Sequence, residues 1–262
     1  MKFALLGSPV EHSLSPQLHN FTYRKLGILA EYERFQVAKG GLSAFLEGHQ
    51  APEWSGFSLT MPLKDEGLAI CNELESDAVA ASSVNTLQWI ASGCKGSNTD
   101  VFGFRFLFSQ AEERDLFRIQ ESSIAILGAG GTARAALVAL NGRNKNVKIY
   151  RRSAVRDGLL QKANPKVEIC SWDECSDAFE ADILINCAPS EAMSSIPDRK
   201  IKGFLYDCLY SPWPTRLMAM TDKAEVFTGK DLLVAQAIKQ VELFLGVNLD
   251  HQGLFTELRS LI

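Results

Sequence analysis

A glycine-rich turn lies between an apolar run and an alanine-rich run near the middle of the chain. The apolar run covers residues 124–127, and the alanine-rich run covers residues 132–140. In the pattern Gly128-x-Gly130-x-x-Ala133, the first glycine permits a tight turn and the second lets a pyrophosphate approach the backbone. Phosphates at such a turn bind the free N–H groups at the start of the next helix. We therefore predict a dinucleotide site over Gly128, Ala129, Gly130, Gly131, Thr132 and Ala133. The alternative is a glycine turn selected only for packing.

The residues after the next predicted strand distinguish two dinucleotides. A site for NAD usually has Asp or Glu about 20 residues after the glycines, where it binds the ribose 2′-hydroxyl. Residues 146–155 contain no acid, and Arg151, Arg152 and Ser153 follow the strand instead. Because Arg binds phosphate bidentately, these side chains favour the 2′-phosphate of NADP. A solvated surface position for one of the two arginines is the alternative.

A lysine and an aspartate have the types and positions needed for proton transfer. Lys64 closes the stretch Thr60-Met61-Pro62-Leu63-Lys64, which leads from a predicted strand into a predicted helix. The dipole at a helix N-terminus disfavours an extra positive charge, which favours a role for Lys64 in proton transfer. Asp100 precedes the apolar residues 101–108 and is either a site carboxylate or a helix N-cap. A solvated surface lysine is the alternative for Lys64.

Short polar side chains stand at other predicted turns. Ser13 and Ser15 follow a predicted strand, and hydroxyl groups there are suited to a carboxylate or a polyol. A turn with a helix cap explains the same two serines, since Ser before Pro is common at a helix start. Asn85 also lies at a predicted turn, where turn chemistry alone accounts for an amide.

These residues need an α/β scaffold to hold them. In the first hundred residues, strands are expected at 2–6, 31–37, 56–59 and near 83–89, and helices at 16–26, 42–47 and 62–74. In the second part, strands are expected at 124–127, 147–150, 167–170, 182–186 and 204–208, with helices at 132–140 and 231–245. This alternation predicts largely parallel sheets in two domains.

The composition excludes several classes of function. The chain has 262 residues, with 27 Lys plus Arg against 31 Asp plus Glu, and no basic block. We therefore expect no nucleic-acid or membrane partner, and no apolar run reaches the roughly 18 residues of a membrane span. The six cysteines form no C-x-x-C pair, so we expect reduced thiols, a cytoplasmic location and no metal site. Monomer and homodimer both remain open.

An ordered set of stretches resembles the shikimate dehydrogenase family, which includes the quinate/shikimate dehydrogenases. They are GSPVEHSLSPQLHN, TMPLK, SVNT, GSNTD, GAGGTARA, LINCAP, LYDCLYSPWPT and GKDLLVAQA, between residues 7 and 237. The resemblance implies a substrate domain at 1–101 and 235–262 and a Rossmann NADP-binding domain at 102–234. It implies reversible, NADP-dependent reduction of 3-dehydroshikimate to shikimate, in aromatic amino-acid (chorismate) biosynthesis, in a cleft between the domains.

The resemblance also assigns roles to positions of this sequence. It makes Lys64 and Asp100 the catalytic pair and Arg151 the ligand of the 2′-phosphate. It assigns substrate binding to Ser13, Ser15, Ser58, Thr60, Asn85, Tyr210 and Gln236.

Three places depart from the family pattern. Ser58 stands where the family usually has Asn, Ala188 stands where it has Thr, and Ser82-Ser83 replaces Gly-Ala. The stretch 190–193, which contains Met193, consequently aligns poorly. Loss of one polar contact to a substrate hydroxyl can change the discrimination between substrates by orders of magnitude. The three departures therefore affect the predicted substrate more than the predicted class of reaction.

Three alternatives remain open. The substrate is quinate, an aminoshikimate-type compound or another shikimate-like polyol carboxylate; the chain is a non-catalytic NADP-binding sensor; or it is a folate or other dehydrogenase with a similar nucleotide domain. A sensor has no need for the pair Lys64 and Asp100, and a folate enzyme has no use for Ser13 and Ser15.

Overall fold

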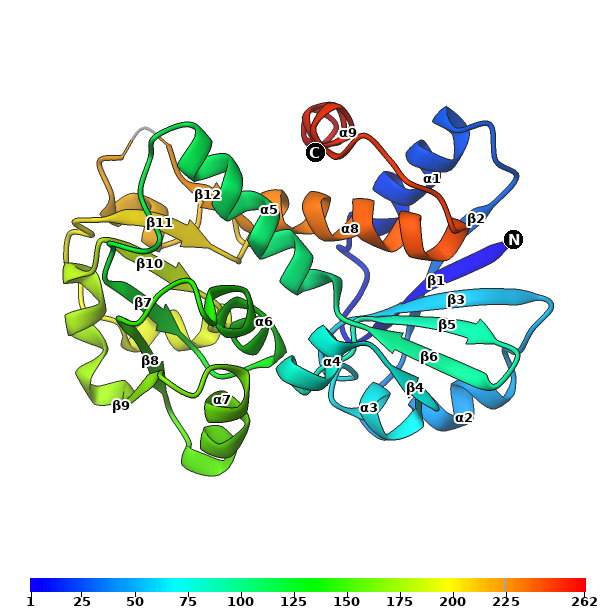
Figure 1. The fold of residues 1–262 in the computed structure, drawn as a ribbon, viewed down its shortest axis with the longest axis horizontal. Coiled ribbons are helices and arrows are strands. Elements are labelled where there is room, and N and C mark those ends of the chain that lie inside the picture. Colours follow the sequence, from blue (N-terminus) through cyan, green and yellow to red (C-terminus); the bar gives the residue numbers. More distant parts are fainter. Residues whose placement is uncertain (224) are drawn as a thin grey trace. The chain divides into compact units, whose positions relative to one another are not determined.

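The chain folds into two compact units. The computed structural model describes residues 1–223 and 225–262. Unit 1 comprises Met1–Gly103 and Leu233–Ile262, and unit 2 comprises Phe104–Leu232. The chain leaves unit 1 within helix α5 (Thr99–Glu113) and re-enters it within helix α8 (Gly229–Leu245) (Figure 1). The breaks expected from the sequence, at 101/102 and 234/235, fall in the same two helices.

Unit 1 is built on a six-stranded mixed sheet with the order β2-β1-β3-β5-β6-β4. Its strands are β1 (Lys2–Gly7), β2 (Glu31–Gln36), β3 (Trp54–Leu59), β4 (Glu73–Leu74), β5 (Thr86–Ile90) and β6 (Gly93–Ser97). Strands β1, β2 and β3 are parallel to one another, β5 is antiparallel to β3 and β6, and β4 is parallel to β6. The carboxyl ends of β1, β3 and β6 therefore meet the amino end of β5 at one edge of the sheet.

Strand β1, which lies next to the edge strand β2, is buried because helices cover both faces of the sheet. Successive side chains of β1 point to opposite faces of the sheet, as strand geometry requires. Ala4 and Leu6 pack in a cluster with Leu42 and Leu46 of helix α2 (Leu42–Glu47). Phe3 packs in a second cluster with Tyr23 of helix α1 (Ser15–Lys25) and Val241 and Phe244 of α8. Figure 1 shows α2 and α3 (Glu66–Ile70) on one face of this sheet and α1 and α8 on the other. The unit also contains α4 (Ser76–Ala81) and α9 (His251–Arg259).

Two local expectations for unit 1 are wrong. The helix expected at 62–74 is reduced to α3, because Glu73–Leu74 pairs with β6 as strand β4. Strand β6 was not expected, since its sequence Gly-Cys-Lys-Gly-Ser has low strand propensity. It forms because Gly93, at φ +123°, turns the chain so that β6 pairs along the whole of β5. Tertiary pairing overrides local propensity at both places.

Unit 2 is a parallel sheet with the order β12-β11-β10-β7-β8-β9. Its strands are β7 (Ile124–Leu127), β8 (Val147–Arg151), β9 (Glu168–Ser171), β10 (Ile183–Asn186), β11 (Phe204–Asp207) and β12 (Phe227–Thr228), with helices α6 (Gly131–Leu140) and α7 (Asp157–Ala163). Numbered from β7, this is the 3-2-1-4-5-6 order of the Rossmann fold. The predicted α/β class, with a Rossmann domain beside a first α/β domain, is confirmed.

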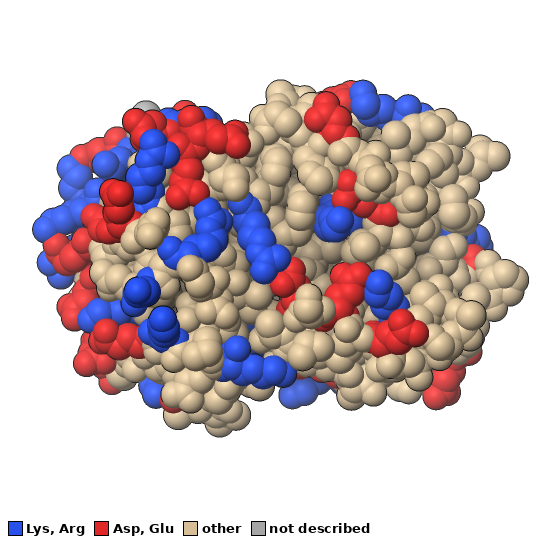
Figure 2. Space-filling model, viewed as in Figure 1, with Lys and Arg blue, Asp and Glu red and all other residues tan. Residues whose placement is uncertain are grey.

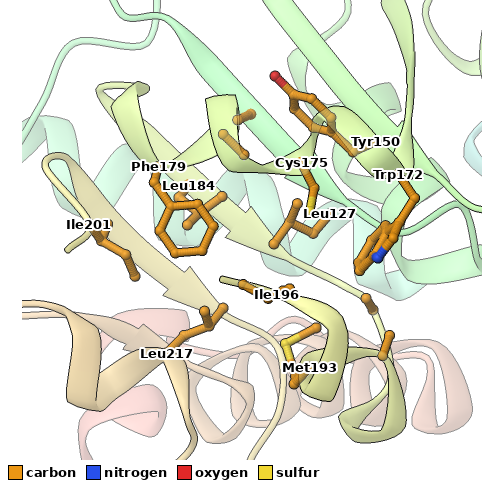
Figure 3. Packing of buried hydrophobic residues seen from close by; sticks show 14 of the residues in the cluster. Leu127, Tyr150, Trp172, Cys175, Phe179, Leu184, Met193, Ile196, Ile201 and Leu217 are labelled. Carbon is orange, nitrogen blue, oxygen red and sulfur yellow. The ribbon is translucent and has the colours of Figure 1, made fainter. Parts of the chain in front are cut away.

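One face of the unit 2 sheet supports a dense apolar cluster (Figure 3). Leu127 and Leu184 project from β7 and β10 towards Cys175 and Phe179 of the 3-10 helical segment Trp172–Glu180. Met193 is 5% exposed and lies in this cluster, with its sulfur 3.6 Å from Asn186 Nδ2. The segment around Met193, which aligned poorly in the sequence, is therefore part of the core of unit 2.

The surface carries charges of both signs. Over the face of unit 2 that Figure 2 draws, Lys and Arg side chains lie beside Asp and Glu side chains. This mixture matches the formal net charge of −4. In the part of the chain that the structure describes, no helix combines the length and the apolar character of a membrane span.

Candidate active site

The predicted site residues of unit 1 converge at the edge of its sheet where β1, β3 and β6 end and β5 begins. The loop after β1 carries Ser13, and the loop after β3 carries Lys64. Asn85 directly precedes β5, and Asp100 lies in the first turn of α5, just after β6. Gly7 allows the first two loops to touch, because a Cβ on it would lie 2.3 Å from Thr60 Cγ2 and 2.8 Å from the Met61 carbonyl oxygen. The Ser8 N–H donates to that same carbonyl at 2.9 Å. The edge is thus one continuous surface.

Lys64 and Asp100 form an ion pair at this edge. The distance from Lys64 Nζ to Asp100 Oδ2 is 2.5 Å, and the side chains are 18% and 7% exposed. Asp100 is the second residue of α5 and does not cap it. Instead, Asn98 Oδ1 accepts from the N–H groups of Asp100 and Val101, at 3.1 and 3.4 Å. The carboxylate is therefore free of helix capping and holds a partly accessible ammonium group.

Asn85 holds the other oxygen of the carboxylate. Its Nδ2 donates to Asp100 Oδ1 at 2.9 Å and to Thr99 Oγ1 at 2.9 Å. Its Oδ1 accepts from the N–H of Thr99 at 2.8 Å and from the hydroxyl of Thr86 at 2.8 Å. Asn85 is 2% exposed, so these bonds are made away from bulk water. Both oxygens of Asp100 consequently have a donor, which sets the plane of the carboxylate.

Gln236 lies beside this group, and Ser58 does not face outward. Gln236 Oε1 is 3.3 Å from Thr99 Oγ1, and its Nε2 donates to the Leu233 carbonyl at 2.9 Å. Ser58 is 2% exposed. Its hydroxyl accepts from Tyr32 at 2.6 Å and donates to Gln240 Oε1 at 2.8 Å. The inward bonds of Ser58 favour a structural role over the expected contact with substrate.

The two serines after β1 lie at the start of α1. Ser13 Oγ accepts from the N–H of Ser15 at 3.3 Å, and Ser15 is the first residue of the helix. The N-cap residue is Leu14, which makes no side-chain cap bond, so neither serine is the N-cap that the sequence suggested. Ser13 and Thr60 are half-buried, and Ser15 is 4% exposed.

A buried histidine lies behind the site. His19 is 0% exposed, stacks on Tyr32 with ring centroids 3.9 Å apart, and places Nε2 3.2 Å from Gln240 Oε1. Burial lowers the pKa of His19 to about 3, although the bond to Gln240 opposes this effect. His19 is therefore neutral in the folded chain at ordinary pH.

We expect this histidine to make stability depend on pH. Between its unfolded pKa of about 6.5 and its folded pKa of about 3, the unfolded chain binds one more proton than the folded chain. Acidification from pH 6.5 to pH 5 should then lower the free energy of unfolding by roughly 1 to 2 kcal/mol, because the unfolded histidine is half protonated at pH 6.5 and almost fully protonated at pH 5. Urea unfolding at the two pH values measures this difference. It should shrink by that amount in His19→Gln, and an unchanged difference contradicts the assignment.

The glycine turn of unit 2 lies where the strand order reverses, between β7 and β10. Gly128 has φ +100°, and a Cβ on it would lie 2.9 Å from the Ala188 N and 3.0 Å from the Cys187 carbonyl carbon. No atom lies within 4 Å of a Cβ built on Gly130, so the N-terminus of the ten-residue helix α6 opens onto free space. Ala133 is 0% exposed and packs in the core. This arrangement fits a pyrophosphate at the helix N-terminus.

Arg151 is the last residue of β8 and forms an ion pair with Asp157 that the sequence did not predict. Its Nε and Nη2 donate to the two carboxylate oxygens of Asp157 at 2.8 and 2.9 Å. The guanidinium lowers the pKa of Asp157. Arg152 is exposed, and Ser153 Oγ accepts from the N–H of Val155 at 3.4 Å. A 2′-phosphate at Arg151 must therefore share this guanidinium with Asp157.

Tyr210 belongs to unit 2, whereas the other predicted substrate ligands belong to unit 1. It follows β11 and is half-buried, and burial raises the pKa of its hydroxyl. Among the described residues, no group of three or more His, Cys, Asp or Glu side chains is placed to hold a metal ion.

Known proteins resemble this chain along its whole length. Residues 5–87 match a family model described as the shikimate dehydrogenase substrate binding domain. A shikimate dehydrogenase (NADP(+)) of Oleidesulfovibrio alaskensis is 31% identical over 99% of this chain and 94% of its own length. The chain belongs to the shikimate dehydrogenase family. A shikimate dehydrogenase (NADP(+)) of Methanococcoides burtonii is 32% identical over 93% of this chain and 92% of its own.

Solved structures of shikimate dehydrogenases have the same fold. The Mycobacterium tuberculosis shikimate dehydrogenase is 30% identical, with a TM-score of 0.81 over 100% of this chain and 99% of its own. A Thermus thermophilus shikimate 5-dehydrogenase in complex with NADP(H) and shikimate is 27% identical, with a TM-score of 0.79 over 100% of both chains. The resemblance seen in the sequence motifs is confirmed.

The residues behind the pair Lys64 and Asp100 were not found from the sequence. Thr86, Thr99, Tyr32, His19 and Gln240 all belong to the buried polar group at this edge. Thr86 and Thr99 lie inside the stretches SVNT and GSNTD, so the motifs that indicated the family also contained these two residues. No sequence signal singles out Gln240.

Proposed function

We propose that this chain is an NADP-dependent shikimate dehydrogenase that reversibly reduces 3-dehydroshikimate to shikimate, in the pathway to chorismate and the aromatic amino acids. The observation that carries the proposal is the ion pair of Lys64 and Asp100, braced by Asn85, in a chain of this family. In this proposal unit 1 binds the substrate and unit 2 binds NADP.

The residues of unit 2 fit a dinucleotide phosphate. Gly130 leaves the backbone accessible at the N-terminus of α6, and Gly128 permits the turn to pass close to the backbone of Cys187 and Ala188. Arg151, with Arg152 and Ser153 beside it, would hold the 2′-phosphate. NADPH supplies the hydride when it is bound. The protein contributes binding, orientation and charge.

Lys64 and Asp100 provide the proton and the local field for the reduction. Negative charge develops on the carbonyl oxygen of the substrate as it is reduced. The ammonium group of Lys64 stabilises this charge and donates its proton, and the Asp100 carboxylate holds the ammonium and accepts from a substrate hydroxyl. Such prearranged charge and positioning contribute several kcal/mol, roughly, to the lowering of the barrier.

The remaining residues hold the substrate. The hydroxyls of Ser13 and Ser15 are suited to its carboxylate, and Thr60, Asn85, Gln236 and Tyr210 are suited to its carboxylate or ring hydroxyls. The Ser58 hydroxyl bonds to Tyr32 and Gln240, so position 58 does not present a long polar side chain to the substrate. That observation favours quinate or another shikimate-like polyol carboxylate as the second candidate substrate.

Initial rates with two alcohols and two cofactors test the function. Oxidation of shikimate and of quinate is followed by the absorbance of the reduced nicotinamide, each with NADP and with NAD. Rapid turnover of shikimate with NADP supports the proposal. Turnover of quinate in its place selects the second candidate, and cofactor binding without turnover of either alcohol selects a sensor.

Replacing Arg151 should separate the two cofactors. We expect Arg151→Ala to weaken NADP binding at least about tenfold and to change NAD binding by less than about twofold, because only NADP has the 2′-phosphate. Calorimetric titration with each cofactor measures the two dissociation constants. Arg143→Ala is the matched control, since Arg143 also forms an ion pair in unit 2, with Glu112. Equal losses for NADP and NAD contradict the assignment of Arg151.

The proposal places the enzyme in the cytoplasm, as a monomer or a homodimer. The six cysteines are free thiols, including Cys71 and Cys94, whose sulfurs lie 3.6 Å apart. Free thiols this close suit a reducing compartment. Light scattering after size-exclusion chromatography distinguishes the two oligomeric states.

A further inference from the structure

Gln240 lies in the middle of α8, is 2% exposed, and has a hydrogen-bond partner for each polar position of its amide. Its Nε2 donates to the backbone carbonyl of Asn85 at 3.2 Å and to the Thr86 hydroxyl at 3.1 Å. Its Oε1 accepts from the Ser58 hydroxyl at 2.8 Å and lies 3.2 Å from His19 Nε2. A buried amide with two donated and two accepted bonds is fully satisfied.

The surroundings permit only one orientation of this amide. The backbone carbonyl of Asn85 can only accept, so the amide nitrogen of Gln240 must face it. His19 is neutral, because burial lowers its pKa to about 3, and its one ring proton lies on Nε2 when it donates to Gln240 Oε1. Its Nδ1 then accepts from the Tyr23 hydroxyl, 3.3 Å away. In this arrangement each hydrogen-bonding proton of Gln240, His19, Tyr23 and Ser58 faces an acceptor.

From Gln240 the bonds run without interruption to the proposed catalytic pair. The Thr86 hydroxyl accepts from Gln240 and has one proton, which it donates to Asn85 Oδ1 at 2.8 Å. With its oxygen held there, Asn85 presents Nδ2 to Asp100 Oδ1 at 2.9 Å. The other oxygen of Asp100 accepts from Lys64. Thr99 also holds this amide, through its N–H and its hydroxyl, so Gln240 supports one of several hydrogen bonds to Asn85.

We propose that Gln240 is a positioning residue that, through Thr86 and Asn85, keeps the Asp100 carboxylate oriented towards Lys64 and the substrate. The proposal rests on the proposed function for its kinetic consequence only. Without the amide of Gln240, the Thr86 hydroxyl loses the donor that it accepts from among the described residues, and its hydrogen bond to Asn85 Oδ1 becomes less restrained. Asn85 then loses one of its restraints, and a rotated Asn85 would turn an oxygen towards the Asp100 carboxylate. Gln240 itself touches neither substrate nor cofactor in this scheme.

The test compares Gln240→Met, which keeps the length of the side chain and removes the amide, with a neighbour on the same helix. Val241→Ala is the matched control, since Val241 is 1% exposed, has no polar side-chain atom and lies in the apolar cluster that contains Phe3 and Phe244. We expect Gln240→Met to lower kcat for shikimate at least about tenfold, while KM for shikimate and the Kd of NADP change less than about threefold. Val241→Ala should lower the thermal unfolding midpoint and leave kcat within about twofold of wild type.

A second measurement does not depend on turnover. Hydrogen exchange of the Asn85 side-chain amide, followed by NMR, should be slow in wild type and in Val241→Ala and at least about tenfold faster in Gln240→Met. Thr86→Val removes only the link from Gln240 to Asn85 Oδ1 and should show the same acceleration, which keeps the test available if Gln240→Met does not fold. Unchanged Asn85 exchange in the folded variants, or an equal loss of kcat in Val241→Ala, overturns the proposal. Slow wild-type exchange in a chain that does not oxidise shikimate overturns the proposed function alone.

Discussion

Lys64→Ala is expected to lower kcat for shikimate oxidation at least about a hundredfold while NADP still binds. Lys64 Nζ is the one positive group bonded to the Asp100 carboxylate among the described residues, and its side chain is 18% exposed. It can therefore reach both a substrate oxygen and solvent protons. Alanine removes the proton donor and leaves the 7% exposed carboxylate without its cation. Steady-state kinetics and NADP titration measure the two effects.

The matched control for this variant is Lys25→Ala. Lys25 is also a lysine of unit 1 and pairs with Glu257 at 2.7 Å, but its side chain is 47% exposed. Exposed ion pairs contribute little to stability, so this variant should keep its activity within about twofold. Wild-type turnover in Lys64→Ala, or a comparable loss in Lys25→Ala, rules out the proposed role of Lys64.

Asp100→Asn is expected to lower kcat by about a hundredfold or more, although it changes the side chain by only one group. Both neighbours of the Asp100 side chain are donors, namely Lys64 Nζ and Asn85 Nδ2. An amide has one oxygen, so its nitrogen must face one of these donors. The variant therefore loses the ionic bond to Lys64 and leaves one buried donor without an acceptor. The kcat of Asp100→Asn and its KM for shikimate are the quantities to measure.

Glu53→Gln is the control for the loss of one negative charge in Asp100→Asn. It removes one carboxylate charge from unit 1 at an exposed pair with Lys2, at the opposite end of β3. We expect its kcat to remain within about twofold of wild type. If Asp100→Asn and Glu53→Gln behave alike, the effect is one of net charge and Asp100 has no specific part in the reaction.

Sequence patterns located most elements because those elements depend on short-range order. The apolar run before Gly128 and the alanine-rich run after it became β7 and α6, within one residue of the expected bounds. The strands expected at 167–170, 182–186 and 204–208 lie within one residue of β9, β10 and β11. A parallel sheet buried on both faces requires continuous apolar strands, and such runs are visible without knowledge of the fold.

Errors arose where a distant partner decided the local structure. The glycine-rich sequence of β6 has little strand propensity of its own and pairs with β5. The short strand β4 ended a helix that local propensity would have continued. The sequence also did not indicate that the Ser58 hydroxyl would accept from Tyr32 and donate to Gln240, both far from it along the chain. The ion pair of Arg151 with Asp157 was not predicted, because an acidic residue was sought only at positions 146–155, where an NAD site usually has one.

The sequence by itself determined the class of the chain: two α/β units, a glycine turn for a dinucleotide, and the residue types of a family that pairs a lysine with an aspartate. These are properties of neighbouring residues and of motif order. Only the tertiary structure decided which side chains touch. Lys64 and Asp100 are 36 positions apart, and Gln240 and Asn85 are 155 positions apart. Hydrogen bonds over such separations depend on how strands and helices pack, and the apolar patterns that locate these elements do not indicate which of their polar side chains meet.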